Sequence, residues 1–345
     1  MIDSGRYTSG RIALANLSSA IDTLELRRDQ HPTFGDLVSL SRLLFVRGDL
    51  LGRIADHDRG ELAANDAVAM SPKPADALFI RAQLAERFHR FEEAETVLEQ
   101  ALAAGHPSQP VDAERAALLQ ATGRYAEALA LRKRLAHDDP RIHALGALAS
   151  LLAEMDEWTL AETCYSAAAE ADDGVSPLPC GQLLFEWGVS AMRRGDLDRA
   201  DEIFAELESI VPAHVPGRGH RAEVALARGE LELAAALVAP LLDSSDDPEY
   251  LATQAELLAA RGAHEAAARV ARCVAAAYER LLARRPEAYA DHAAAFFMGI
   301  GNRPQLAVEL ARKNLKLRDT PRSRRLLARA LRNAERVGVS SAGAA

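Results

Sequence analysis

Histidines and carboxylates are the side chains of this sequence that could bind a metal ion or transfer protons in catalysis. The chain has ten histidines, and His143, His220 and His292 fall on stretches with helical apolar spacing. We expect no second histidine or carboxylate at ligand spacing beside any of these three. Because a zinc site needs several ligands brought together, we predict no metal site and no catalytic residue.

The sequence also lacks the short motifs that usually indicate an enzyme. It contains no phosphate-binding loop, dinucleotide fingerprint, zinc-protease helix motif or nucleophile elbow. Cys164, Cys180 and Cys273 are scattered without a Cys-x-x-Cys pair, so neither a disulfide framework nor a zinc site is indicated. We therefore expect a protein that is not an enzyme, that has no cofactor and that works in a reducing compartment.

Composition predicts that helices position these side chains. Alanine and leucine dominate the apolar residues, aromatics are 5% and β-branched runs are absent, so we expect an all-α fold. The 50 acidic and 41 basic residues are interspersed and give a net charge of −9, which argues against a nucleic-acid partner. No stretch reaches the roughly eighteen apolar residues of a membrane span. We expect a cytoplasmic protein, although a chain that had lost a signal peptide would read the same.

The stretch from Cys180 to Pro212 reads as one complete helical hairpin. Apolar residues recur every three or four positions before Gly195, and again between Gly195 and Pro212. Glycine suits the left-handed residue that ends a helix, and proline cannot continue one. Gly188 and Ala200 fall where the two antiparallel helices would cross, so small side chains there would let the backbones approach closely.

The small residue of the second helix recurs along the whole chain. Its positions are Ala20, Gly60, Ala94, Ala128, Ala161, Ala200, Ala234, Ala267 and Ala307. The steps between them are 40, 34, 34, 33, 39, 34, 33 and 40 residues. This pattern resembles the tetratricopeptide repeat, a helix–turn–helix unit of about 34 residues. The resemblance implies a right-handed superhelical solenoid of antiparallel helix pairs.

We expect a single solenoid over residues 1–345. Its parts are an incomplete first unit at 11–32, eight helix-pair units at 36–321, a break at 172–179 that could serve as a hinge, a capping helix at 322–337 and a disordered tail at 338–345. The arginines of the capping helix would give the end of the solenoid a polar outer face. The alternative is that they form a basic handle for an acidic partner.

The resemblance also implies a binding surface, because the first helices of stacked tetratricopeptide repeats line a concave groove. The peptide-binding residues mapped onto that groove are Phe45, Asp49, Phe79, Glu86, Phe185, Glu186, Val189, Arg193, His220, Glu223, Glu256, Tyr289, His292 and Phe296. The groove inventory is acidic with apolar patches, so we expect a partner segment with basic residues and apolar anchors. The alternative is that the acids only keep the surface soluble. No lysine lies on these helices, which disfavours the clamp that some tetratricopeptide domains use for a terminal carboxylate.

Together these features predict a binding or scaffold protein that holds a peptide or helix of a protein partner in its groove. One alternative is a regulatory sensor, in which a small peptide or metabolite changes the curvature of the superhelix. Another is an enzyme that uses groove glutamates and histidines.

Overall fold

The structure, a computed structural model, describes residues 4–342, with side chains described for 5–336. These residues form helices and turns, and no strand occurs among them. After a short 3₁₀ helix (Ser4–Arg6), the α-helices are α1 (Gly10–Gln30), α2 (Phe34–Leu51), α3 (Ile54–Met70), α4 (Pro74–Arg87), α5 (Phe91–Ala103), α6 (Ser108–Ala121), α7 (Tyr125–Asp138), α8 (Ile142–Glu154), α9 (Trp158–Glu170), α10 (Leu178–Arg194), α11 (Leu197–Ile210), α12 (Val215–Ala227), α13 (Leu231–Val238), α14 (Leu241–Ser244), α15 (Pro248–Ala260), α16 (His264–Arg284), α17 (Ala290–Met298), α18 (Pro304–Leu317) and α19 (Pro321–Ala342). The all-α prediction is confirmed. No helix within residues 4–342 is long and apolar enough to span a membrane.

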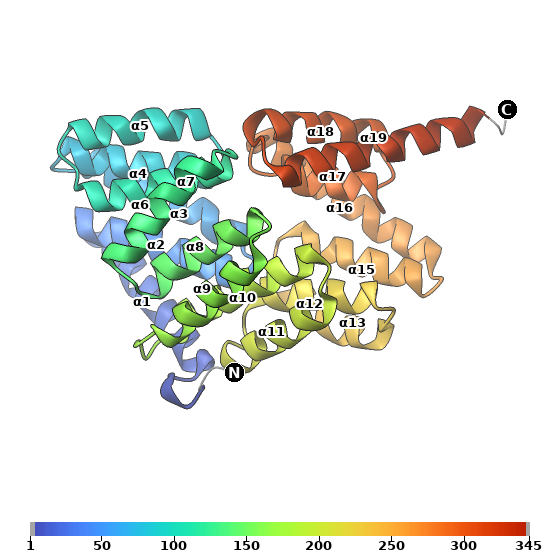
Figure 1. The fold of residues 1–345 in the computed structure, drawn as a ribbon, viewed down its shortest axis with the longest axis horizontal. Helices are drawn as coiled ribbons and strands as arrows, with labels where there is room; N and C mark the ends of the chain where they lie inside the picture. The colour runs from blue at the N-terminus through green and yellow to red at the C-terminus, as the bar shows by residue number, and fades with distance from the viewer. Residues whose placement is uncertain (1–3, 343–345) are drawn as a thin grey trace.

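Consecutive helices pack as pairs, and the pairs follow one another around a curved array (Figure 1). The pairs are α2/α3, α4/α5, α6/α7, α8/α9, α10/α11, α12/α13, α15/α16 and α17/α18, and α19 packs on the last pair. The solenoid of helix pairs predicted from the repeat is therefore confirmed.

The turn inside each pair has a residue with positive φ at the same repeat position. Five of these residues are glycines, at positions 52, 123, 195, 229 and 262, and the others are His89, Asp156 and Asn302. A left-handed residue ends the first helix and directs the chain into the second. Asn and Asp tolerate this conformation better than most other side chains, so the turn geometry persists where the glycine does not.

The helix crossing predicted at Gly188 and Ala200 is present. A Cβ added to Gly188 would lie 2.5 Å from the ring of Phe204 in the facing helix, and Ala200 is fully buried. Close approach of α10 and α11 therefore depends on small side chains at both positions.

Two element boundaries differ from the sequence prediction. The second helix of the sixth pair is interrupted at Ala239 and Pro240, so that α13 and α14 stand where one helix was expected. Proline lacks the N–H that a continuous helix needs. Helix α19 runs to Ala342, five residues past the expected end at 337. Residues 343–345 of the expected tail lie outside the described residues.

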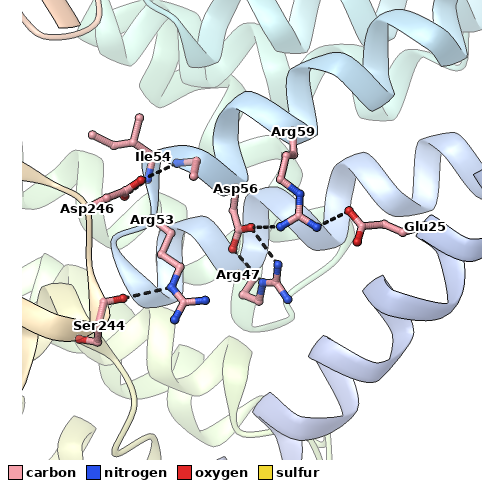
Figure 2. Close-up of polar contacts among 9 residues, drawn as sticks. Glu25, Arg47, Arg53, Ile54, Asp56, Arg59, Ser244 and Asp246 are labelled. Atoms are coloured by element: carbon pink, nitrogen blue, oxygen red, sulfur yellow. Dashed lines mark hydrogen bonds and ion pairs between the residues drawn. The ribbon is translucent and has the colours of Figure 1, made fainter. Parts of the chain in front are cut away.

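The C-terminal half of the array packs back on the N-terminal half. Asp246 accepts hydrogen bonds from the backbone N–H groups of Ile54 (2.6 Å) and Ala55 (3.0 Å), at the start of α3. Nearby, Arg53 Nε donates to the Ser244 carbonyl oxygen at 3.0 Å (Figure 2). We call these three hydrogen bonds the closing contact; they join Arg53, Ile54 and Ala55 to Ser244 and Asp246.

Two further regions join the same halves. Arg285, at the end of α16, pairs with Asp58 at 2.7 Å and lies over the ring of Phe88 at 4.0 Å. Farther along, Arg318 Nε donates to the carbonyl oxygen of Ala121 at 3.4 Å. The helical array is therefore closed on itself.

The break at 172–179 is attached to the start of the chain. The Tyr7 hydroxyl donates to Asp172 Oδ2 at 2.8 Å, and the Thr8 N–H donates to the Val175 carbonyl oxygen at 2.8 Å. Asp172 is buried. Any hinge motion at this break would have to release these contacts, and the hinge stays a prediction.

Candidate ligand-binding surface

A cavity of about 720 Å³ lies on the inner side of the closed array. Its lining comes from first helices α4, α6, α8 and α10, from second helices α7 and α9, and from the junction of α18 and α19. The volume falls within the ~300–1,000 Å³ of typical ligand sites. We call it the arginine cavity, after the arginines that line it: Arg132, Arg193, Arg194, Arg318, Arg322 and Arg325.

Positive charge predominates in the arginine cavity. Against its six arginines stand four carboxylates, at Glu86, Glu154, Asp156 and Glu186. Two of these already accept hydrogen bonds, Glu154 from the Tyr125 hydroxyl (2.9 Å) and Glu186 from an amide group (2.9 Å). Burial raises the pKa of both Glu86 and Glu186, which disfavours their charged forms.

The arginines differ in how they are paired. Arg318 and Arg322 reach the buried Asp291 at 3.8 and 3.9 Å, and Arg194 lies over the ring of Trp158 at 5.4 Å. The other three arginines of the cavity form no ion pair and no side-chain hydrogen bond among the described residues. They are Arg132, Arg193 and Arg325.

Two of these arginines have lowered pKa values. The enclosure of Arg193 and the nearby Arg322 charge lower the pKa of Arg193 to about 10. Burial likewise lowers the pKa of Arg132, and its Nε atom is buried without a hydrogen-bond partner. A buried charged donor without a partner costs free energy, so an incoming anion would remove a penalty that the free protein bears.

Beside the cavity lies an acid–histidine cluster of Glu249, Asp291 and His292. His292 Nδ1 lies 3.5 Å from Glu249 Oε1, and Nε2 lies 3.9 Å from Asp291 Oδ1. The Asp291 charge, followed by that of Glu249, raises the pKa of His292 to about 10 despite burial. Although burial opposes it, the His292 charge holds the pKa of Asp291 well below its usual range. The cluster is thus a set of satisfied ion pairs, and neither it nor any other group of His, Cys, Asp and Glu side chains in the described residues is arranged to hold a metal ion.

A second pair of a histidine and a glutamate lies on α12. His220 Nδ1 is 3.0 Å from Glu223 Oε2, and the Glu223 charge raises the pKa of His220 against the effect of burial. Glu223 follows His220 by three residues, so the expectation that no carboxylate stands at ligand spacing beside His220 is wrong. The Phe185 ring lies against His220 (centroids 5.6 Å apart) and His214 (5.1 Å).

A smaller cavity of about 330 Å³ lies between α2 and α4. Phe45 lines it, with the Arg87 guanidinium 4.4 Å above its ring. Arg87 also donates two hydrogen bonds to Asp49, at 2.9 and 3.0 Å. Burial alone would raise the pKa of Asp49, but the His57 hydrogen bond and the Arg87 charge lower it to about 2.

The structure distributes the sequence-predicted site residues over these regions. The arginine cavity contains Glu86, Glu186 and Arg193; the smaller cavity contains Phe45 and again Glu86, with Asp49 alongside; the histidine groups contain His220, Glu223, His292 and Phe185.

The remaining predicted residues lie apart from these groups or inside the core. Phe79 stacks on His106 with centroids 4.1 Å apart, Glu256 is exposed and Tyr289 is half-buried. Val189 and Phe296 are each only 5% exposed, so neither offers a surface to a ligand.

Sequence reasoning missed most of the arginine cavity. Arg132 lies on a second helix, and Arg318, Arg322 and Arg325 lie at the C-terminal end. They reach the inner face because the array closes on itself. The arginine-rich composition of residues 322–337 was the available signal, and it left open whether those arginines cap the solenoid or bind an acidic partner.

Paired helices stacked into a curved array with a lined inner face define a helical-repeat solenoid. A family model of the tetratricopeptide repeat matches residues 45–110 and 147–214. These two segments therefore resemble the tetratricopeptide repeat, and the chain has the fold of a tetratricopeptide-repeat solenoid. No curated protein matches the sequence.

Solved structures agree on the fold. A chain of the APC/C hetero-tetramer Cut9-Hcn1 aligns with a TM-score of 0.52 and 17% identity, over 91% of this chain and 59% of that one. Yeast Tom70 aligns with a TM-score of 0.52 and 13% identity, over 90% of this chain and 65% of that one. The chain thus spans less than two thirds of either. A tetratricopeptide repeat protein from Parabacteroides merdae ATCC 43184 has a TM-score of 0.48 and 17% identity, over 87% of this chain and 98% of that one.

Proposed function

We propose that the chain is a non-enzymatic protein-binding scaffold that holds a segment of a partner protein on its inner face. The observation that carries the proposal is the arginine cavity, a space of about 720 Å³ that opens to solvent on the concave side of a tetratricopeptide array. Rigid helices form its walls, so binding would order few groups of the protein itself. The assembly named for one structural neighbour, a hetero-tetramer, supports a role in protein association.

The cavity combines charge with apolar surface, as a peptide site requires. Ala117, Ala147 and Trp158 line it, and each is partly exposed. Apolar surface removed from water supplies affinity, and the charged groups fix the register of the partner.

The test is affinity capture with a variant whose cavity is blocked. Ala147 lines the cavity, so Ala147→Trp should obstruct it. Ser209 is exposed on second helix α11, so Ser209→Trp is the matched control. Mass spectrometry should identify proteins retained by the parent and by Ser209→Trp but lost from Ala147→Trp. If all three retain the same proteins, the inner face is not the binding surface.

The size of the cavity also favours the sensor alternative, because ~300–1,000 Å³ suits a small molecule. A sensor would change shape when it binds its ligand. Small-angle scattering with and without ligand separates the two functions, since a scaffold should keep its radius of gyration and a sensor should not.

A further inference from the structure

We propose that the arginine cavity binds an acidic segment of the partner, whose carboxylates pair with Arg132, Arg193 and Arg325. This inference rests on the proposed function and adds the chemistry of the ligand. It reverses the partner expected from the sequence, which was a basic segment.

The first argument is the local sign of the charge. The chain as a whole carries a net charge of −9, yet six arginines face four carboxylates in this cavity. An excess of positive charge on a concave surface concentrates anions there and repels basic segments. A solvated face with no function would be expected to follow the acidic average of the chain.

The second argument is that the cavity has cations without partners. Arg132, Arg193 and Arg325 have neither an ion pair nor a side-chain hydrogen bond among the described residues, and Arg132 Nε is buried with no acceptor. Desolvation, and after it the Arg322 charge, lower the pKa of Arg193, although Glu154 and Glu186 oppose the shift. An anion within reach of these guanidinium groups would accept their hydrogen bonds and stabilise their charges.

The third argument concerns the kind of anion. Guanidinium groups present paired N–H donors that match the two oxygens of a carboxylate. The cavity is open to solvent rather than enclosed, so a chain longer than the cavity can enter and leave it. Apolar lining at Ala117, Ala147 and Trp158 provides contacts for side chains between the acids. An acidic peptide with interspersed apolar residues fits this lining.

The experiment is a display selection of random ten-residue peptides on the immobilised full chain, followed by fluorescence anisotropy with the recovered peptides. We expect the recovered sequences to be enriched in Asp and Glu. The variant Arg132→Gln/Arg193→Gln/Arg325→Gln should bind them at least about 30-fold more weakly. Because Arg132, Arg193 and Arg325 form no ion pair among the described residues, these three changes break none.

The matched control changes three arginines of the same terminal helix outside the cavity. Arg329, Arg332 and Arg336 are exposed, and the variant Arg329→Gln/Arg332→Gln/Arg336→Gln removes the same charge. It should bind within about twofold of the parent. If the cavity variant fails to fold, the single reversals Arg325→Glu and Arg329→Glu replace the two triple variants, and only Arg325→Glu should weaken binding.

The outcomes separate the inference from the proposed function. Recovered peptides that are basic or show no charge preference, and that still compete for the cavity, would overturn the acidic assignment and leave the scaffold function intact. Equal weakening by both variants would also overturn it. No enrichment of any peptide would remove both. Citrate binding with the same arginine dependence, and without acidic peptides among the recovered sequences, would assign the site to a free polycarboxylate instead.

Discussion

The carboxylate of Asp246 caps the helix that begins at Ile54, although the two residues are 192 positions apart. Helix α3 has no side-chain cap of its own, because its N-cap residue is Arg53. Asp246 instead accepts hydrogen bonds from the first two backbone N–H groups of the helix, those of Ile54 and Ala55. A carboxylate at a helix N-terminus satisfies unpaired donors and interacts favourably with the helix dipole. One residue therefore stabilises a local element and also closes the array.

The first prediction concerns this cap. Asp246→Ala should lower the free energy of unfolding by about 1–2 kcal/mol, the usual value of an N-cap. Hydrogen exchange of the Ile54 and Ala55 amides should become faster, because both lose their acceptor. Asp243→Ala is the control, since Asp243 is exposed in the same segment. Equal exchange in the two variants would show that the cap does not hold α3 in solution.

The second prediction concerns the ion pairs beneath the closing contact. Asp56 is only 2% exposed and accepts from Arg47 Nε and Nη2 at 2.8 Å each, while Arg59 donates to it at 2.8 Å (Figure 2). Asp56→Asn should destabilise the fold by about 3–5 kcal/mol, because it leaves buried guanidinium charge uncompensated.

The control for this change lies on the same helix. Asp66 pairs with Arg28 at 2.6 Å, but its side chain is 48% exposed. Asp66→Asn should therefore cost less than about 1 kcal/mol. Urea denaturation of both variants measures the difference, and comparable losses would mean that the Asp56 network is solvated rather than buried.

The third prediction concerns the crossing of α10 and α11. Ala200→Leu should destabilise the fold by about 1–3 kcal/mol through overpacking, and Gly188→Leu should do at least as much because the Phe204 ring occupies the space. Ser209→Leu, on the exposed face of α11, should change stability by less than about 0.5 kcal/mol. Thermal melting of the three variants provides the measurement. If Ala200→Leu and Ser209→Leu melt together, the crossing is misplaced.

The repeat could be predicted from the sequence because its signals are local. The small residues of the second helices and the glycine turns recur at nearly constant spacing, and each helix pair closes over a few residues. Of the nine small residues between Ala20 and Ala307 that mark the repeat, eight are buried as expected and Ala20 is half-buried. Even where His89 replaces the turn glycine, φ stays positive at 59°, because the flanking helices impose the turn.

The closure of the array could not be predicted in this way. Asp246 and Asp247 are adjacent and chemically alike, and both stand before Pro248, so either one reads as the cap of α15. In the structure Asp247 accepts from the Glu249 N–H at 2.9 Å and caps its own helix, while Asp246 caps α3. Only the accumulated curvature of the pairs decides which element Asp246 meets.

The same reason explains why the lining of the arginine cavity could be predicted only in part. Repeat position identifies side chains on first helices, and it located Glu86, Glu186 and Arg193 on the inner face. Arg132 and Arg325 enter the same cavity from a second helix and from the C-terminal helix. Their sequence positions carry no information on where the two ends of the array meet.

The last prediction is a pH dependence of stability that arises at Glu114. Burial, and then the nearby Glu86 charge, raise the pKa of Glu114 to about 7 in the folded protein. Between the usual pKa of a glutamate, ~4.3, and this value, the folded state binds more protons at this site than the unfolded state. The contribution of Glu114 to stability therefore decreases as pH rises through this interval and is constant above it.

Glu114→Gln removes this dependence, because glutamine keeps the shape and does not ionise. The melting temperature of Glu114→Gln relative to the parent should therefore be higher at pH 8 than at pH 5. Comparing each variant with the parent at the same pH cancels the other titrating groups. Glu99→Gln, exposed on α5, is the control and should show the same difference from the parent at both pH values. A Glu114→Gln difference that does not change between pH 5 and pH 8 would mean that the Glu114 carboxylate is ionised without penalty in the folded protein.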